Sequence, residues 1–275
     1  TVESIAPQAA QALCVYRGRV FMSGLADSNQ IAYSLLAFTG DAPAFTDAFT
    51  VTLDPTDGPV TACAVMDDKL VIFKRQAIYV LQGSGPTNTG EQDDLGTPSK
   101  IASDIGAARQ SSVVLTPLGL MFQTASGAVY LLDRGLSVSY IGAPIEKLND
   151  GTAYTSASRV SSAREVRFTT AAGKTAVMNY ELGLWGTFTQ QTAVASTIWQ
   201  ERFVYARPDG SVWVEAPGTF TDGGAFVKMR VTTSWMPFAG VQGFQRCQKI
   251  MLLGDYKGAH KIRVRIGTDY QESYT

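Results

Sequence analysis

The sequence predicts an all-β fold: a β-propeller of about five or six four-stranded blades, with a further β module beginning near the C-terminus. Three observations predict it. An aromatic residue recurs in similar strand-like segments, a second apolar strand follows most of these segments after a short turn, and several strands are apolar at every position. Hairpins repeated roughly every 40 to 50 residues are typical of propeller blades. Strands without polar alternation are typical of sheets covered on both faces, as stacked blades are.

The recurring aromatic residue marks the first strand of each expected hairpin. Successive occurrences lie 52, 49, 46 and 37 residues apart. They are Phe21, Phe73, Phe122, Phe168 and Tyr205.

The last four of these segments are each followed by a second strand, and the turns between the strands have suitable residues. Gly127, Gly173 and Gly210 lie in the turns, where a positive φ angle is often needed. The second strands begin at Ala77, Ala128, Ala176 and Ser211. The segments "LVIF", "AIYVL", "VVL" and "AVYLL" are apolar throughout, so we expect each to be covered on both faces. An irregular β-sandwich with coincidental spacing stays open as an alternative.

The expected blades occupy residues 1–221. A long polar loop, 83–100, leaves the second repeat, and we expect it to be either functional or mobile; its first part, "GSGPTNTG", is expected to be flexible. From residue 222 the hairpin pattern stops, so we expect residues 222–275 to form a closing sheet or the start of a second β module. The chain begins with Thr1 rather than Met and stops in a strand-like segment, so we expect both ends to be cut.

Composition favours a globular protein without a membrane-spanning segment. The chain has 275 residues, 45% of them hydrophobic, which is enough to bury a large core. No stretch approaches the roughly 18 consecutive apolar residues of a membrane-spanning helix.

Residues that carry chemistry are few, and we expect no catalytic residue, no metal site and no cofactor. His260 has only Asp255 as a nearby carboxylate in the sequence. Adjacent carboxylates occur as Asp67-Asp68 and Asp93-Asp94, in turn or loop sequence where acids are ordinarily solvated. The cysteines lack metal-ligand spacing and are expected to be core thiols: Cys14, Cys63 and Cys247. Four aromatic side chains are expected between blades rather than in a sugar site: Tyr79, Tyr130, Trp185 and Trp213.

Charge is balanced overall but uneven along the chain. Between Ala225 and Arg265 there are eight cations and one acid, which leaves 15 cations and 23 acids elsewhere. In "KIRVRI" the alternation of a strand places three cations on one face and three apolar residues on the other. The basic face meets an acidic partner or a phosphate backbone, or it is simply solvated. The candidate partner-facing or DNA-facing residues are Arg246, Lys249, Lys257, Lys261, Arg263 and Arg265.

Four segments in succession resemble the propeller-bearing tail proteins of short-tailed bacteriophages, the nozzle or tail hub stabilisation proteins. The resemblance extends from about Arg17 to the end of the chain. The segments are "DGPVTACAVMDDKLVIFKRQAIYVLQGSGP", "IASDIGAARQSSVVLTPLGLMFQTASGAVYLLDRGLSVSYIGAPIE", "YELGLWGTFT" and "FTDGGAFVKMRVTTSWMPFAGVQGFQRCQKIMLLGDY".

The resemblance implies a structural virion protein rather than an enzyme. Such proteins are made in the host cytoplasm and form a homo-oligomeric ring, usually a hexamer, below the tail adaptor and portal. The ring extends the channel through which genomic DNA leaves and anchors tail fibres or spikes. Two other functions stay open: a carbohydrate-binding, lectin-like propeller and a propeller glycosidase. A lectin needs aromatic residues at loop tips, and a glycosidase needs two carboxylates in one pocket.

Overall fold

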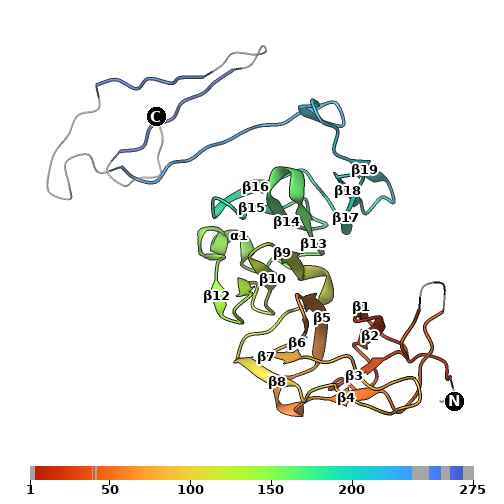
Figure 1. Ribbon diagram of the computed structural model, residues 1–275. Helices are drawn as coiled ribbons and strands as arrows, with labels where there is room; N and C mark the ends of the chain where they lie inside the picture. Colours follow the sequence, from red (N-terminus) through yellow and green to blue (C-terminus); the bar gives the residue numbers. More distant parts are fainter. Residues whose placement is uncertain (1–3, 39, 41, 237–247, 255–260, 269–275) are drawn as a thin grey trace, which may run out of the picture. The chain divides into compact units, whose positions relative to one another are not determined.

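The computed structural model describes residues 4–38, 40, 42–236, 248–254 and 261–268 (Figure 1). The chain divides into two compact units, Thr1–Thr219 and Phe220–Thr275. We call them the blade unit and the C-terminal unit. The division lies two residues before the boundary expected from the sequence.

The blade unit consists of antiparallel sheets whose strands follow one another in chain order. The first sheet contains β1 (Ala12–Tyr16), β2 (Arg19–Ser23), β3 (Gln30–Tyr33) and β4 (Thr50–Thr52). The second contains β5 (Val60–Met66), β6 (Lys69–Lys74), β7 (Ala77–Leu81) and β8 (Ser99–Ser103). The third contains β9 (Val114–Thr116), β10 (Gly119–Gln123), β11 (Val129–Asp133) and β12 (Val138–Tyr140). The fourth contains β13 (Ser156–Val160), β14 (Glu165–Thr169), β15 (Thr175–Asn179) and β16 (Leu184–Phe188). The fifth has three strands in the described residues: β17 (Ala195–Trp199), β18 (Arg202–Ala206) and β19 (Val212–Val214).

Helical structure in the described residues is limited to single turns between strands. They are the 3-10 turns η1 (Pro55–Asp57), η2 (Gln110–Ser112), η3 (Ala143–Ile145) and η4 (Ser161–Ala163), and the short helix α1 (Glu146–Asn149). The all-β prediction is therefore confirmed.

The sheets stack in chain order as the blades of a β-propeller. A hydrophobic cluster lies between each sheet and the next, so each sheet is covered by its neighbours. The first strands also lie next to one another from blade to blade: β1 beside β5, β5 beside β9, β9 beside β13 and β13 beside β17. Neighbouring first strands with successive strands leading outward are the arrangement of propeller blades.

The repeated aromatic residues lie on the second strand of each blade, not the first as the sequence predicted. A less buried strand precedes each of them, and it was not recognised from the sequence. β9, for example, has an exposed Leu115 at its centre and is not covered on both faces, which corrects the expectation for "VVL". In contrast, β7 is buried at every position, as predicted for "AIYVL".

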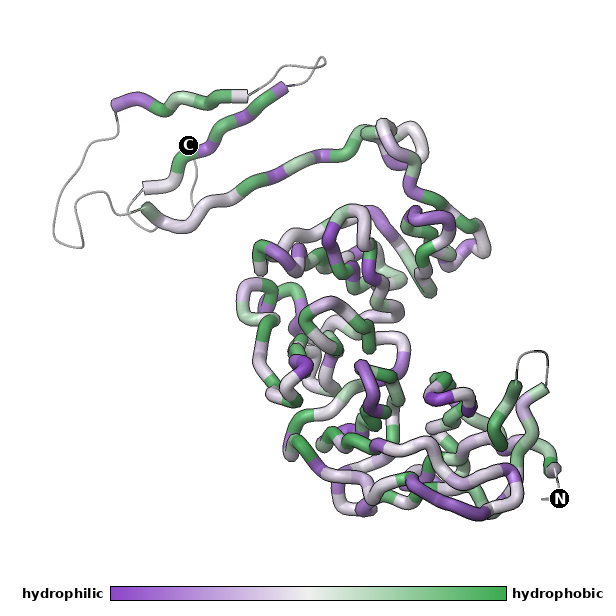
Figure 2. The backbone as a smooth tube through the Cα atoms, viewed as in Figure 1, coloured by the Kyte–Doolittle hydropathy of each residue, from purple (hydrophilic) through white to green (hydrophobic). Residues whose placement is uncertain are grey.

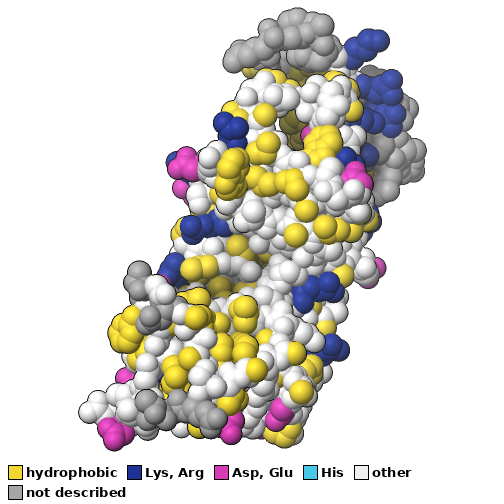
Figure 3. Space-filling model, turned by 90° about the vertical axis from the view of Figure 1, so that its right-hand side faces the viewer, with side chains coloured by type: hydrophobic (Ala, Val, Ile, Leu, Met, Phe, Trp, Pro, Cys, Tyr) yellow, Lys and Arg dark blue, Asp and Glu magenta, His cyan; other side chains and the backbone are white. Residues whose placement is uncertain are grey.

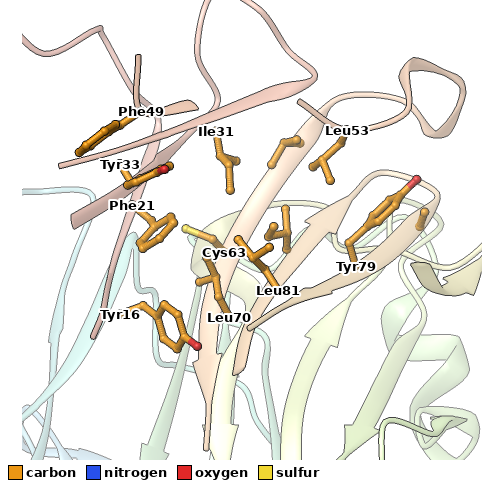
Figure 4. Packing of buried hydrophobic residues seen from close by; sticks show 13 residues of the cluster. Tyr16, Phe21, Ile31, Tyr33, Phe49, Leu53, Cys63, Leu70, Tyr79 and Leu81 are labelled. Atoms are coloured by element: carbon orange, nitrogen blue, oxygen red, sulfur yellow. The ribbon is translucent and has the colours of Figure 1, made fainter. Parts of the chain in front are cut away.

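The interface between the first two blades shows how these residues pack. Phe21, Tyr33 and Phe49 of the first blade form a stack with ring centroids 5.1 and 5.2 Å apart. Figure 4 shows these rings beside aliphatic side chains of the second blade, including Leu70 and Leu81. Figure 2 shows how hydrophobic and hydrophilic stretches alternate along the chain.

The long loop after β7 is anchored, which corrects the expectation of a flexible segment. It ends at Ser99, where β8 begins. The guanidinium of Arg19, 1% exposed, donates to the backbone oxygens of Ser84 (2.8 Å) and Pro86 and to that of Ser34 (2.9 Å). Asn88 pairs with the backbone of Leu36 through both its amide atoms. Buried hydrogen bonds from an ionised donor are among the stronger ones, so the loop is fixed to the first blade.

We expect Arg19→Met to release this loop. The apolar side chain fills similar space but leaves three carbonyl oxygens without their donor, which costs about 1 to 3 kcal/mol each where they stay dry. Limited proteolysis measures the outcome: cleavage within residues 84–98 is expected to accelerate at least about tenfold. Arg202→Met, at an exposed arginine at the start of β18, is the matched control and leaves the rate unchanged. Equal cleavage rates in both variants would contradict the anchoring role of Arg19.

The C-terminal unit contains one short hairpin in its described residues, made by β20 (Thr221–Asp222) and β21 (Ala225–Phe226). The described residues 227–236, 248–254 and 261–268 carry no strand, although their sequences alternate as strands do.

Candidate assembly surface

The candidate basic residues lie in the C-terminal unit. Arg246 and Lys257 fall outside the described residues, as do His260 and Cys247. Lys261, Arg263 and Arg265 are described and exposed, and Lys249 is exposed as well.

The predicted half-buried strand at residues 261–266 is not found in the described residues. Its apolar side chains are exposed instead of packed, with Ile262 at 70%, Val264 at 48% and Ile266 at 43%. A strand needs a partner for its backbone groups, and this segment has none in the described part of the chain. Residues 227–231 have the same character: Met229 and Val231 are 84% and 74% exposed, with Lys228 and Arg230 between and beside them. In both described segments, cations alternate with apolar side chains that are exposed.

The fifth blade carries a second incomplete surface. The four preceding blades each have a fourth strand paired with the third, whereas β19 is an edge strand in the described residues. Val212 and Val214 of β19 are 70% and 47% exposed, and Trp199 at the end of β17 is 60% exposed. An exposed edge with apolar side chains is a template for pairing with another strand.

Contacts of one buried arginine link this edge to the fourth blade. Arg167 of β14 forms ion pairs with Glu165 at 3.0 Å and with Glu215, just after β19, at 2.8 Å. Its guanidinium also lies 4.9 Å from the ring centroid of Phe203 in β18. The Arg167 side chain is 4% exposed and that of Glu215 is 49% exposed, so the ion pair and the ring contact link the fifth blade to the fourth at a half-exposed position.

Charged groups elsewhere on the blade unit are dispersed. On the face drawn in Figure 3, cations and acids lie in separate groups among hydrophobic and other side chains. The acid pairs from the sequence have local structural roles. Asp67 pairs with Arg134, and Asp94 accepts hydrogen bonds from the backbone N–H groups of Ser84 and Gly85 at 2.7 Å. They form no pair of carboxylates facing one pocket.

Other predicted positions belong to the blade interfaces. All four singled-out aromatic side chains pack in or against the inter-blade clusters, which confirms the structural role predicted for them. Tyr79 also donates its hydroxyl to Asp57, whose pKa is lowered chiefly by the hydrogen bond from Lys100 and then by that from Tyr79. Cys63 is buried and Cys14 packs against the same cluster, as expected of core thiols.

Comparisons with known proteins found similarity among solved structures alone. No protein-family model matches the chain, and no curated protein matches it. Among solved structures, PorZ of the type-IX secretion system of Porphyromonas gingivalis has a TM-score of 0.49 at 12% identity, covering 79% of this chain. BamB from Moraxella catarrhalis has a TM-score of 0.49 at 15% identity over 74% of this chain. The Neurospora crassa Pan2 WD40 domain has a TM-score of 0.42 at 20% identity over 60%. The chain spans 28% of the PorZ chain, 57% of BamB and 48% of the Pan2 domain.

No helix among the described residues has the length and apolar character needed to cross a membrane.

Proposed function

We propose that the chain is a structural protein of a bacteriophage tail. In this role copies of the chain form a ring, a hexamer, below the adaptor and portal proteins of the virion. The ring extends the channel for genomic DNA and anchors fibres or spikes. The role requires no catalysis, and the protein acts in the virion after synthesis in the host cytoplasm. The order of sequence segments that resembles nozzle and tail hub proteins supports this assignment.

The segregation of charge carries the proposal most directly. The segment from Ala225 to Arg265 has eight cations and one acid, while the rest of the chain has 15 cations and 23 acids. The basic segment of one copy and the net negative charge of the rest of the next copy attract each other in a head-to-tail contact. Such heterologous contacts close into rings when the rotation between copies allows it. The exposed apolar side chains beside these cations supply area to bury in the same contact.

The basic segment is tested by replacing its described cations. We expect Lys261→Ser, Arg263→Ser and Arg265→Ser together to weaken self-association about tenfold or more. The reason is that ion pairs across an interface contribute about 0.2 to 1 kcal/mol each when exposed and more when desolvated. Sedimentation velocity over a range of concentrations measures the association, and added salt weakens the wild type in the same direction.

A control variant separates this role from a general effect of charge. Lys147→Ser, Lys174→Ser and Arg202→Ser remove three exposed cations from the blade unit. This variant is expected to associate as the wild type does. If all three proteins associate equally, the basic segment is not part of the interface. If both variants are weakened equally, the effect comes from net charge and not from a specific contact.

A further inference from the structure

A groove lies at one end of the blade unit, beside the starts of three consecutive first strands. It is a hollow of ≈ 590 Å³ lined by Gln11, just before β1, by Val60 at the start of β5, and by residues 108–111, just before β9. A second hollow of ≈ 560 Å³ is lined by residues 8–11 and 24–26 and shares Gln11 and Leu25 with the first. The two together form a trough rather than a closed cavity.

Two arginines line the groove without a partner. Arg75 lies in the turn between β6 and β7, and Arg109 lies directly before η2. Both side chains are exposed, and within the described residues neither has a hydrogen bond or an ion pair. No acid is among the residues that line the hollow. Arg134 and Arg164 elsewhere in the unit are each paired with a carboxylate, whereas the two groove arginines have no such partner.

The backbone that carries these arginines is held in place. The backbone N–H of Arg75 donates to Pro59 at 3.0 Å. Gly106 packs directly against the end of β6, next to Arg75. A Cβ atom at position 106 would lie 1.9 Å from the backbone oxygen of Lys74. The backbone oxygen of Arg109 accepts from both the N–H and the hydroxyl of Ser112, at 3.2 and 2.8 Å. The fixed backbone keeps both cations at the same groove, where they attract a ligand that bears negative charge.

The lining favours one class of anion. Guanidinium groups bind carboxylate and phosphate oxygens in paired hydrogen bonds. The lining residues include no aromatic side chain, so there is no platform on which a nucleic-acid base would stack. They do include Leu25 and Val60, and they offer the amide of Gln11 and the hydroxyls of Ser28 and Ser111 to a polypeptide backbone. We propose that this groove binds an extended acidic peptide segment of a partner protein. The proposal stands whether or not the protein belongs to a phage tail.

Binding of defined peptides tests the groove. The probe is a short fluorescent peptide of alternating Glu and Gly, compared by anisotropy with the same peptide carrying Gln in place of Glu. We expect the acidic peptide to bind at least about tenfold more tightly, and salt to weaken it. The variant with Arg75→Ala and Arg109→Ala is expected to lose at least about tenfold in affinity for the acidic peptide.

The matched control carries Arg159→Ala and Arg202→Ala, two exposed arginines outside the groove with no partner in the described residues. It is expected to bind as the wild type does, and circular dichroism checks that both variants are folded. Equal affinity for the Glu and Gln peptides would overturn the proposal, as would an equal loss in the two double variants. An oligothymidylate that binds more tightly than the acidic peptide, and depends on Arg75 and Arg109, would assign the groove to nucleic-acid phosphates instead.

Discussion

Phe122→Ala is expected to lower the free energy of unfolding by about 3 to 5 kcal/mol. Phe122 is 0% exposed at the centre of the cluster between the second and third blades. Its ring lies 5.0 Å from that of Phe73 and 6.2 Å from that of Tyr130, measured between centroids. Truncation removes apolar contacts from both blades and leaves a cavity that the flanking sheets cannot close. Urea-induced unfolding, followed by circular dichroism, measures the loss.

Phe38→Ala is the matched control, because that side chain is 68% exposed in the same unit. It is expected to change the free energy of unfolding by less than about 0.5 kcal/mol. A similar small effect for Phe122→Ala would mean that the second and third blades do not share a core. Stacking of successive blades would then be wrong as a description of the fold.

Gly106→Ala is expected to destabilise the protein by about 3 kcal/mol, although it adds a single methyl group. An added Cβ atom would lie 1.9 Å from the backbone oxygen of Lys74 and 2.8 Å from the carbonyl carbon of Arg75. Backbone atoms cannot rotate away as a side chain can, so residues 105–109 must shift from the β6–β7 turn. The same shift moves Arg109 away from Arg75 and is expected to weaken binding of an acidic peptide in the groove.

Gly186→Ala tests whether the close approach, rather than the loss of glycine, causes the effect. Gly186 lies in β16, and a Cβ atom there meets nothing within 4 Å. The substitution is expected to be neutral or slightly stabilising, because alanine loses less conformational entropy in a strand than glycine. Urea midpoints for the two variants decide the matter, and equal midpoints would contradict the steric account of Gly106.

The repeat of blades was predictable because its signal is strong and local. Phe73 and Phe122 are buried between two sheets, and the central residues of their strands, β6 and β10, are apolar on both faces. The turn glycines were predictable for the same reason: Gly127 has a φ angle of 93°, which disfavours residues with a Cβ atom.

The first strand of each blade was not predictable from this pattern. β13, for example, alternates buried and partly exposed positions and presents Ser156 and Ser158 to a hydroxyl of β17. Polar residues in such a strand look like loop sequence. The anchored loop was missed because its fixed point, Arg19, lies more than 60 residues away in sequence. Nothing in the local sequence distinguishes a buried arginine from a solvated one.

The sequence likewise predicted one part of the candidate site and missed another. The excess of cations near the C-terminus is visible in the sequence, but the strand expected at residues 261–266 is not formed in the described residues. Alternation shows that a segment is suited to a strand, whereas pairing needs a partner edge. The groove with Arg75 and Arg109 gave no sequence signal, since its residues come from the segment before β1, the start of β5 and four separate connections, which only the stacked blades bring together.

The central claim is that copies of this chain assemble into a ring, and its native mass tests that claim most directly. Native mass spectrometry over a range of concentrations, with negative-stain class averages from the same sample, measures both copy number and symmetry. We predict rings of about six copies around an open channel. A protein that stays monomeric at every concentration, with single particles and no ring classes, would contradict the account.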